Sequence, residues 1–297
     1  MVDSGRHPLY DMQMGSGLDL QLRDGRTLHV YDSAPDVGGT PDAAGAPTVL
    51  WSHGSPQTGA LLEPLLAAAA ERGIRLLSYG RPSYGGSSAL PGRSVGSAAS
   101  DVEQLADALG VDRFAVMGAS GGGPHALACA ALLPDRVVAV ACLSTLAPFG
   151  ADGLNWFGGM ASDSASLRAA ARGRAARAEY EQTAEFDPSS FIERDYAALD
   201  GRWSSLGADV GLASAAGAEG LIDDDLAYVA PWGFDVADIA APVLLVHGSL
   251  DRVVPPAHSE WLLRHCPDAE LWTRPRDGHI SVLDAAPVAL DWLRARW

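Results

Sequence analysis

The chain has 297 residues, of which 47% are hydrophobic and 20% are charged, and its formal net charge at pH 7 is −16. This composition is typical of a soluble globular protein with one large domain or two modest ones, and it excludes fibrous and disordered classes. Because such an acidic surface repels phosphate groups, we expect neither nucleic acid nor a membrane as a partner.

The N-terminal residues 1–17 contain no apolar core of the kind that a signal peptide needs. No stretch approaches the ~18 consecutive apolar residues that span a bilayer. Cys129, Cys142 and Cys266 each lie within an apolar segment, which favours buried free thiols in a reducing compartment. We therefore predict a cytoplasmic protein.

The first predicted element is a β-hairpin. Residues 17–31 alternate apolar and polar side chains around Asp24-Gly25, a dipeptide suited to a tight turn. Residues 34–47 are rich in Gly, Pro, Ala and Asp and predict a loop.

From Thr48 onward, short apolar runs alternate with helical patterns. The apolar runs predict strands over 48–52, 74–78, 113–117 and 136–143. The stretches between them predict helices over 60–72, 95–109 and 124–133. Because the runs lack strict alternation, we predict a mostly parallel, doubly wound sheet with helices on both faces, an α/β fold.

The pattern changes at residue 149, after which residues 149–237 predict only helices and turns. Strands return at 242–247 and 270–273, with a helix after Pro256 and another that ends at Trp297. We therefore predict a core domain of residues 1–148 and 238–297, interrupted by a helical cap of residues 149–237.

A serine lies at the turn between the predicted strand 113–117 and the helix that follows it. The turn reads Gly118-Ala119-Ser120-Gly121-Gly122, a G-x-S-x-G pattern that is informative only in this context. A serine on so tight a turn adopts strained backbone angles, and its neighbours at two residues on either side must be small. We predict that Ser120 is a nucleophile, whereas a surface serine on a glycine-rich turn is the alternative.

A serine nucleophile needs a base and an acid that orients the base. Asp251 follows the strand 242–247, and His279 lies between the last strand and the last helix. Both positions adjoin the carboxyl ends of strands, in the chain order serine, acid, histidine. A surface turn for Asp251 and a structural role for His279 are the alternatives. Four other histidines lie in helices or at less suitable places: His125, His247, His258 and His265.

The loop after the first buried strand reads Trp51-Ser-His53-Gly54-Ser55-Pro56. Acyl transfer places negative charge on the carbonyl oxygen, which preorganised N–H groups stabilise. We predict that the amides of Ser55 and Gly121 form this oxyanion hole. His53 is interpreted as a residue that braces the loop, with a place at the substrate pocket as a further hypothesis.

Together these segments resemble the α/β-hydrolase superfamily over nearly the whole chain. The motifs are the HG-x-P loop at 53–56, R-P-x-Y-G-x-S at 81–87, the serine turn, the G-x-x-D-x-x-V-P turn at 248–255 and D-G-H at 277–279. In detail the chain resembles esterase and peroxidase-like members with a helical cap. The resemblance implies a Ser120–Asp251–His279 triad, an acyl-enzyme intermediate and no metal or cofactor. The chain departs from the dehalogenase and epoxide hydrolase branches, which have Asp at the position of Ser120. It also has M-G-A-S where prolyl aminopeptidases usually have W-G-x-S.

Several large apolar residues of the predicted cap could line a pocket above Ser120. These are Phe149, Trp156, Phe157, Met160, Trp203, Trp232 and Phe234. We expect most of them to pack the cap onto the core, and we select Trp156, Phe157 and Trp232 as pocket candidates. Arg168, Arg172, Arg174 and Arg177 predict a solvated helix face, with a patch that recognises carboxylates as the alternative. The run 223–225 predicts an acidic helix N-terminus.

The leading hypothesis is a serine hydrolase that cleaves small to medium carboxylic esters, as a monomer or homodimer. A C–C bond hydrolase or an aminopeptidase with the same triad is a second hypothesis, and the aminopeptidase would need cap carboxylates near the pocket. A non-catalytic ligand-binding protein on the same scaffold is the third.

Overall fold

The computed structural model describes residues 16–34 and 46–297, and its strands form one eight-stranded sheet. The spatial order is β1-β2-β4-β3-β5-β6-β7-β8. The strands are β1 (Ser16–Gln21), β2 (Thr27–Asp32), β3 (Thr48–Ser52), β4 (Arg75–Tyr79), β5 (Phe114–Ala119), β6 (Val137–Leu143), β7 (Val243–Gly248) and β8 (Ala269–Arg274). Strands β3 to β8 pair in parallel, whereas β2 pairs antiparallel with both β1 and β4. The predicted loop over 34–47 and residues 1–15 lie largely outside the described residues.

The central strands are apolar along their whole length because both faces of the sheet are covered. Every residue of β3, β5 and β7 is buried, as a two-sided parallel sheet requires. In β2, which pairs with the edge strand β1, half-buried and buried residues alternate. The hairpin and the continuous apolar runs were both predicted correctly.

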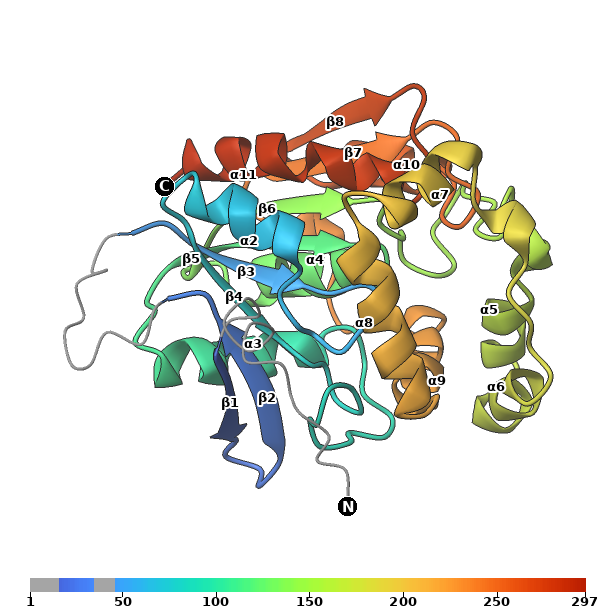
Figure 1. The fold of residues 1–297 in the computed structure, drawn as a ribbon, viewed down its shortest axis with the longest axis horizontal. Helices are drawn as coiled ribbons and strands as arrows, with labels where there is room; N and C mark the ends of the chain where they lie inside the picture. The colour runs from blue at the N-terminus through green and yellow to red at the C-terminus, as the bar shows by residue number, and fades with distance from the viewer. Residues whose placement is uncertain (1–15, 35–45) are drawn as a thin grey trace, which may run out of the picture.

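Two layers of helices cover the sheet (Figure 1). Helices α2 (Glu63–Ala70) and α11 (Ala286–Arg294) pack on one face, around Trp51, Leu65 and Leu290. Helices α3 (Ser97–Ala108), α4 (Gly122–Leu132) and α10 (Ala257–His265) pack on the other face. Helix α2 starts later than the predicted residue 60, because Pro64 occupies its first turn, where its missing N–H leaves no bond unmade.

Between β6 and β7 the chain forms only helices within the described residues, and we call residues 144–242 the β6–β7 segment. Its helices are η1 (Ala161–Ser164), α5 (Ala165–Ala170), α6 (Arg174–Glu181), η2 (Pro188–Ser190), α7 (Glu193–Asp200), α8 (Ser204–Ala215), α9 (Glu219–Tyr228) and η3 (Val236–Asp238). Figure 1 shows α5, α6, α8 and α9 beyond the carboxyl ends of the parallel strands. The remaining helix, η4 (Ser281–Ala285), precedes α11.

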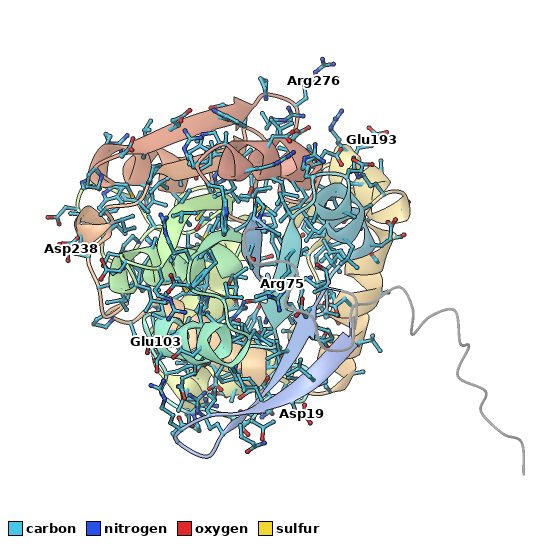
Figure 2. All side chains as sticks on the ribbon, turned by 90° about the vertical axis from the view of Figure 1, so that its left-hand side faces the viewer. Asp19, Arg75, Glu103, Glu193, Asp238 and Arg276 are labelled. Atoms are coloured by element: carbon cyan, nitrogen blue, oxygen red, sulfur yellow. The ribbon has the colours of Figure 1, made fainter. Side chains whose placement is uncertain are left out.

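Charge is distributed mainly at the periphery of the fold. Figure 2 shows Glu193, Asp238 and Arg276 at the outline of the molecule. Cys129, Cys142 and Cys266 are buried free thiols, as predicted. In the described part of the chain, no helix combines the length and apolarity that crossing a bilayer needs.

Candidate active site

Ser120 lies on the tight turn between β5 and α4. Its φ of 51° is in the left-handed region, which is unfavourable for a residue with a side chain. A Cβ at position 118 would lie 2.5 Å from the Gly122 carbonyl oxygen, and one at position 122 would clash with the Ser52 carbonyl oxygen. Only glycine fits at both positions, so the G-x-S-x-G spacing is a steric requirement of this turn.

Ser120, His279 and Asp251 form one hydrogen-bonded series, although 159 residues separate the first two in sequence. The Nε2 atom of His279 lies 2.9 Å from the Ser120 Oγ, and its Nδ1 lies 2.8 Å from the Asp251 Oδ2. Because a carboxylate only accepts, Nδ1 carries the ring hydrogen and Nε2 is left to accept the serine proton. The structure therefore brings together the three residues that the sequence selected.

The surroundings of Asp251 and His279 favour an ionised Asp251. Its Oδ1 accepts the amides of Val253 and Val254, each at 2.9 Å. Burial disfavours the charged carboxylate, but His279 and His247 outweigh that effect and hold the pKa of Asp251 below its ordinary value. For His279, burial lowers the pKa, but the Asp251 carboxylate outweighs burial and raises it above the ordinary imidazole value.

The loop after β3 lies directly beside the serine turn. A Cβ built at Gly54 would be 3.7 Å from the Ser120 Cβ, and one built at Gly121 would be 2.6 Å from the Ser55 Oγ. Among the described residues, no acceptor takes the amide hydrogen of Ser55 or of Gly121. Two N–H groups of adjoining loops therefore have no acceptor among the described residues.

A buried ionic cluster from α9 supports this loop. The Ser55 hydroxyl donates to the Asp224 Oδ2 at 2.5 Å and lies 3.0 Å from the Tyr228 hydroxyl, which donates to the Gly121 carbonyl at 3.0 Å. Asp224 also pairs with Arg81 at 2.7 Å and Arg93 at 2.8 Å. Burial opposes its ionisation, but the two guanidinium groups outweigh burial and keep the pKa of Asp224 well below its ordinary value.

Two sequence interpretations fail at this cluster. Asp223, Asp224 and Asp225 lie in the middle of α9 and are buried, so the prediction of an acidic helix N-terminus is wrong. The predicted solvated arginine face is wrong for Arg177, which is 1% exposed and donates to Asp225 at 2.6 Å. In both cases a run of charged residues in the sequence suggested an exposed surface. The structure instead buries these charges and pairs them with residues from other parts of the chain.

A substitution that removes the charge of Asp224 is expected to have a large effect on the free energy of unfolding. Replacement of Asp224 by Asn leaves Arg81 and Arg93 buried without a counter-charge, and we expect it to cost roughly 3–5 kcal/mol of unfolding free energy. Urea unfolding measures this cost. Glu219→Gln on the same helix is the control, because its side chain is 73% exposed and an exposed pair contributes about 0–1 kcal/mol. Equal midpoints for the two variants would contradict the prediction.

His53 has the bracing role that the sequence favoured. It is fully buried, its Nδ1 lies 2.7 Å from the Gly54 carbonyl, and its Nε2 accepts the Arg81 amide at 3.0 Å. Burial first, and Arg81 second, lower its pKa well below the ordinary value, which matches a neutral ring that accepts one hydrogen bond. The further hypothesis that His53 lines the pocket is wrong.

Two cavities adjoin Ser120. The apolar cavity, of about 380 Å³, also contacts His279, and among its described lining residues no carboxylate, lysine or arginine occurs. The apolar side chains in its wall include Trp51, Leu62, Phe191, Leu206 and Leu283. The polar cavity, of about 660 Å³, includes Arg177, Glu181, Glu185, Asp187 and Asp225. The two cavities share six lining residues, Ser55, Ser120, Phe186, Ser190, Val210 and Val253.

The predicted pocket role of Trp156, Phe157 and Trp232 is wrong, because none of them lines either cavity. Trp156 is 4% exposed and donates its Nε1 hydrogen to the Ala147 carbonyl at 2.8 Å. Trp232 is 3% exposed and donates to the Tyr228 carbonyl at 3.2 Å. Phe157 packs under the Arg168 guanidinium. These rings pack the β6–β7 segment onto the core instead.

The sequence reasoning missed the aromatic residues of the β6–β7 segment that do line the apolar cavity, Phe186 and Phe191. Leu206 and Val210 also line it, from one face of α8. The i, i+4 spacing of Leu206 and Val210 was the one signal for that face in the sequence.

The other histidines have structural partners: the Nδ1 of His258 accepts the Ala147 amide at 3.1 Å, and that of His125 lies 2.8 Å from the Gly121 carbonyl. Within the described residues, no group of three or more His, Cys, Asp or Glu side chains could hold a metal ion.

Comparison with known proteins identifies the fold. A family model described as "alpha/beta hydrolase fold" matches residues 47–286. No curated protein matches the sequence. Similar solved structures include a hydrolase from Pseudomonas aeruginosa PA01, with 23% identity, a TM-score of 0.68 and coverage of 94% of this chain and 97% of that one.

Two further similar structures have named activities. An esterase from Thermogutta terrifontis has 19% identity and a TM-score of 0.68, covering 95% of this chain and 99% of its own. An enol-lactonase from Burkholderia xenovorans LB400 has 22% identity and a TM-score of 0.67, covering 94% and 99%. At these identities the likeness concerns the fold. With the family match over most of its length, the chain belongs to the alpha/beta hydrolase fold family.

Proposed function

We propose that this protein is a serine hydrolase that cleaves carboxylic esters with apolar acyl groups through an acyl-enzyme on Ser120. The observation that carries the proposal is the Ser120–His279–Asp251 series at the junction of two cavities. A nucleophile, a base and an orienting acid within hydrogen-bond distance are the parts that acyl transfer needs.

In the proposed reaction, His279 Nε2 takes the Ser120 proton as Oγ attacks the ester carbonyl carbon. The amides of Ser55 and Gly121 stabilise the negative oxygen of the tetrahedral intermediate. The C–O bond to the alcohol then breaks, and His279 returns the proton to the leaving oxygen. Water repeats the sequence on the acyl-enzyme, with His279 as its base, and releases the carboxylic acid and free Ser120.

The acyl group is assigned to the apolar cavity. None of its described lining residues is a carboxylate, lysine or arginine that an apolar chain would leave unsolvated, and its volume suits a small or medium acyl group. We assign the role of a cap to residues 149–237, because Phe186, Phe191 and Leu206 of this stretch line the cavity that also contains Ser120.

Gly207 offers a test of this assignment. It lines the apolar cavity, and a Cβ built there has no heavy atom within 4 Å. We expect Gly207→Leu to fill the space and lower kcat/KM for a hexanoate ester by roughly 10-fold or more, with little effect on the acetate ester of the same alcohol.

Gly211→Leu is the matched control for Gly207→Leu. Gly211 lies on the same helix, a Cβ there also meets nothing, and it does not line the cavity. Steady-state kinetics with both esters decide the matter. Equal chain-length profiles for the two variants would reject the apolar cavity as the acyl site.

A second candidate function is hydrolysis of aminoacyl substrates. The supporting observation is that Glu181, Glu185 and Asp225 line the polar cavity beside Ser120, where carboxylates could meet a protonated amine. A panel of chromogenic esters and aminoacyl anilides, with a fluorophosphonate probe for Ser120, separates the candidates. Faster turnover of anilides would favour the second function, and no labelling with no turnover would favour a non-catalytic protein.

A further inference from the structure

Helix α7 of the β6–β7 segment holds the loop that carries His279. The Asp195 carboxylate accepts the backbone N–H of His279 at 3.2 Å, of Ile280 at 3.0 Å and of Ser281 at 2.8 Å. Arg194 pairs with Asp277 at 2.7 Å. Figure 2 labels Glu193, the first residue of α7, and Arg276 of the loop, both at the outline of the molecule.

Asp195 is buried and fully engaged in this contact. It is 1% exposed. Its Oδ1 accepts the Ser281 hydroxyl at 2.7 Å, and its Oδ2 accepts the Ile192 amide at 3.1 Å. A carboxylate that accepts several N–H groups in a dry environment forms strong, geometrically restrictive bonds. The position of His279 along the loop therefore depends on a side chain more than 80 residues away.

The glycine of the D-G-H motif is explained by the same contact. A Cβ at position 278 would clash with the Asp195 Oδ2. Gly278 thus allows the carboxylate to approach the backbone beside His279. Asp277, in turn, pairs with Arg274 at 2.9 Å as well as with Arg194, so the loop is fixed from both sides.

Asp195 also adds negative charge near the imidazole. Together with Asp251 it favours the protonated form of His279 and raises its pKa. The charged and titratable groups around the loop are Asp251 with His247 behind it, Asp195 and Arg194 from α7, Asp277, and Arg274 at the end of β8.

We infer that Asp195 is a positioning residue for His279, through which the β6–β7 segment sets the geometry of the nucleophile and its base. This inference rests on the proposed function. Asp195 lines neither cavity, so it acts on the imidazole and not on the substrate. Its removal should therefore lower kcat and leave KM nearly unchanged.

Asp195→Asn is the first test, with an ester that the wild type cleaves. The asparagine amide cannot accept all the hydrogen bonds that the carboxylate accepts, so we expect the loop that carries His279 to shift. Because a displacement of about 1 Å can cost a catalytic group ~100-fold in rate, we expect kcat to fall by roughly 10- to 100-fold. Loss of the negative charge also moves the acid limb of kcat/KM to lower pH. A merely structural residue would lower the melting temperature without moving that limb.

A double-mutant cycle isolates the contact. Gly278→Ala should lower kcat in the wild type, because its Cβ displaces the Asp195 carboxylate. In an Asp195→Ala background the same substitution should have a smaller effect, since the clash is gone. Ser281→Ala removes the hydroxyl that donates to Asp195 and accepts the Gly278 amide but leaves the Asp195 carboxylate in place, so it should give a milder loss of kcat and serves if Asp195→Asn does not fold.

Asp200→Asn, at the exposed end of α7, is the control and should match the wild type. The inference is overturned if Asp195→Asn folds and keeps the kcat and the acid limb of the wild type. If Asp195→Asn does not fold, the inference is overturned when Ser281→Ala keeps the kcat and the acid limb of the wild type. It is also overturned if Gly278→Ala has the same effect in both backgrounds. In each of these cases, abolition of turnover by Ser120→Ala would show that the proposed function itself still stands.

Discussion

Replacement of Ser120 by Ala is expected to abolish turnover of any ester that the wild type cleaves. The Oγ is the atom that bonds to the acyl carbon in the proposed reaction, and no other hydroxyl is hydrogen-bonded to the His279 Nε2 among the described residues. Loss of a serine nucleophile lowers kcat by about 10⁶-fold where the triad acts as a unit. Steady-state kinetics and fluorophosphonate labelling measure the loss.

Ser100→Ala is the control for this substitution, since Ser100 is exposed on α3, away from both cavities. Its kinetics should equal those of the wild type. Serine and alanine both carry a Cβ, so the strain of the positive φ at position 120 is about the same in both, and the alanine variant should fold as well as the wild type, which thermal unfolding checks. Residual ester turnover within 10-fold of the wild type, a tolerance set by the ~10⁶-fold loss expected, would remove Ser120 as the nucleophile.

Asp251→Asn has the second largest expected effect. The carboxylate holds the imidazole with its hydrogen on Nδ1, whereas an amide can instead donate to Nδ1 and place the hydrogen on Nε2, where it blocks proton transfer from serine. We expect a loss of about 10⁴-fold in kcat. Asp268→Asn, at an exposed position before β8, is the control.

The contact between Asp251 and His279 leads to a prediction for the pH dependence of kcat/KM. Protonated His279 cannot act as a base, so kcat/KM of the wild type falls as the pH falls through the pKa of His279. Because the pKa is raised, the midpoint of this acid limb should lie above the ordinary imidazole value of 6.5. In Asp251→Asn the favourable charge is absent, so the midpoint should move down. A wild-type limb well below pH 6.5 would contradict the role assigned to the carboxylate.

The sequence by itself determined the sheet, the serine turn and the three residues of the hydrogen-bonded series. Each depends on short-range patterns: buried strands read as apolar runs, and the turn around Ser120 admits only glycine at positions 118 and 122. In a parallel sheet the carboxyl ends of strands share one edge, so residues that follow β5, β7 and β8 meet there. Chain order and local chemistry were therefore enough to select Ser120, Asp251 and His279.

Only the tertiary structure decided which residues surround this site. Trp156 and Trp232 resemble pocket residues by composition, yet they pack the β6–β7 segment onto the core, whereas Phe186 and Phe191 line the apolar cavity. The contact between Ser55 and Asp224 spans 169 residues. Contacts of this kind depend on how separate helices dock, which neither hydrophobic periodicity nor turn chemistry encodes. For that reason the sequence selected Ser120, Asp251 and His279, and the fold alone assigned the side chains that hold and enclose them.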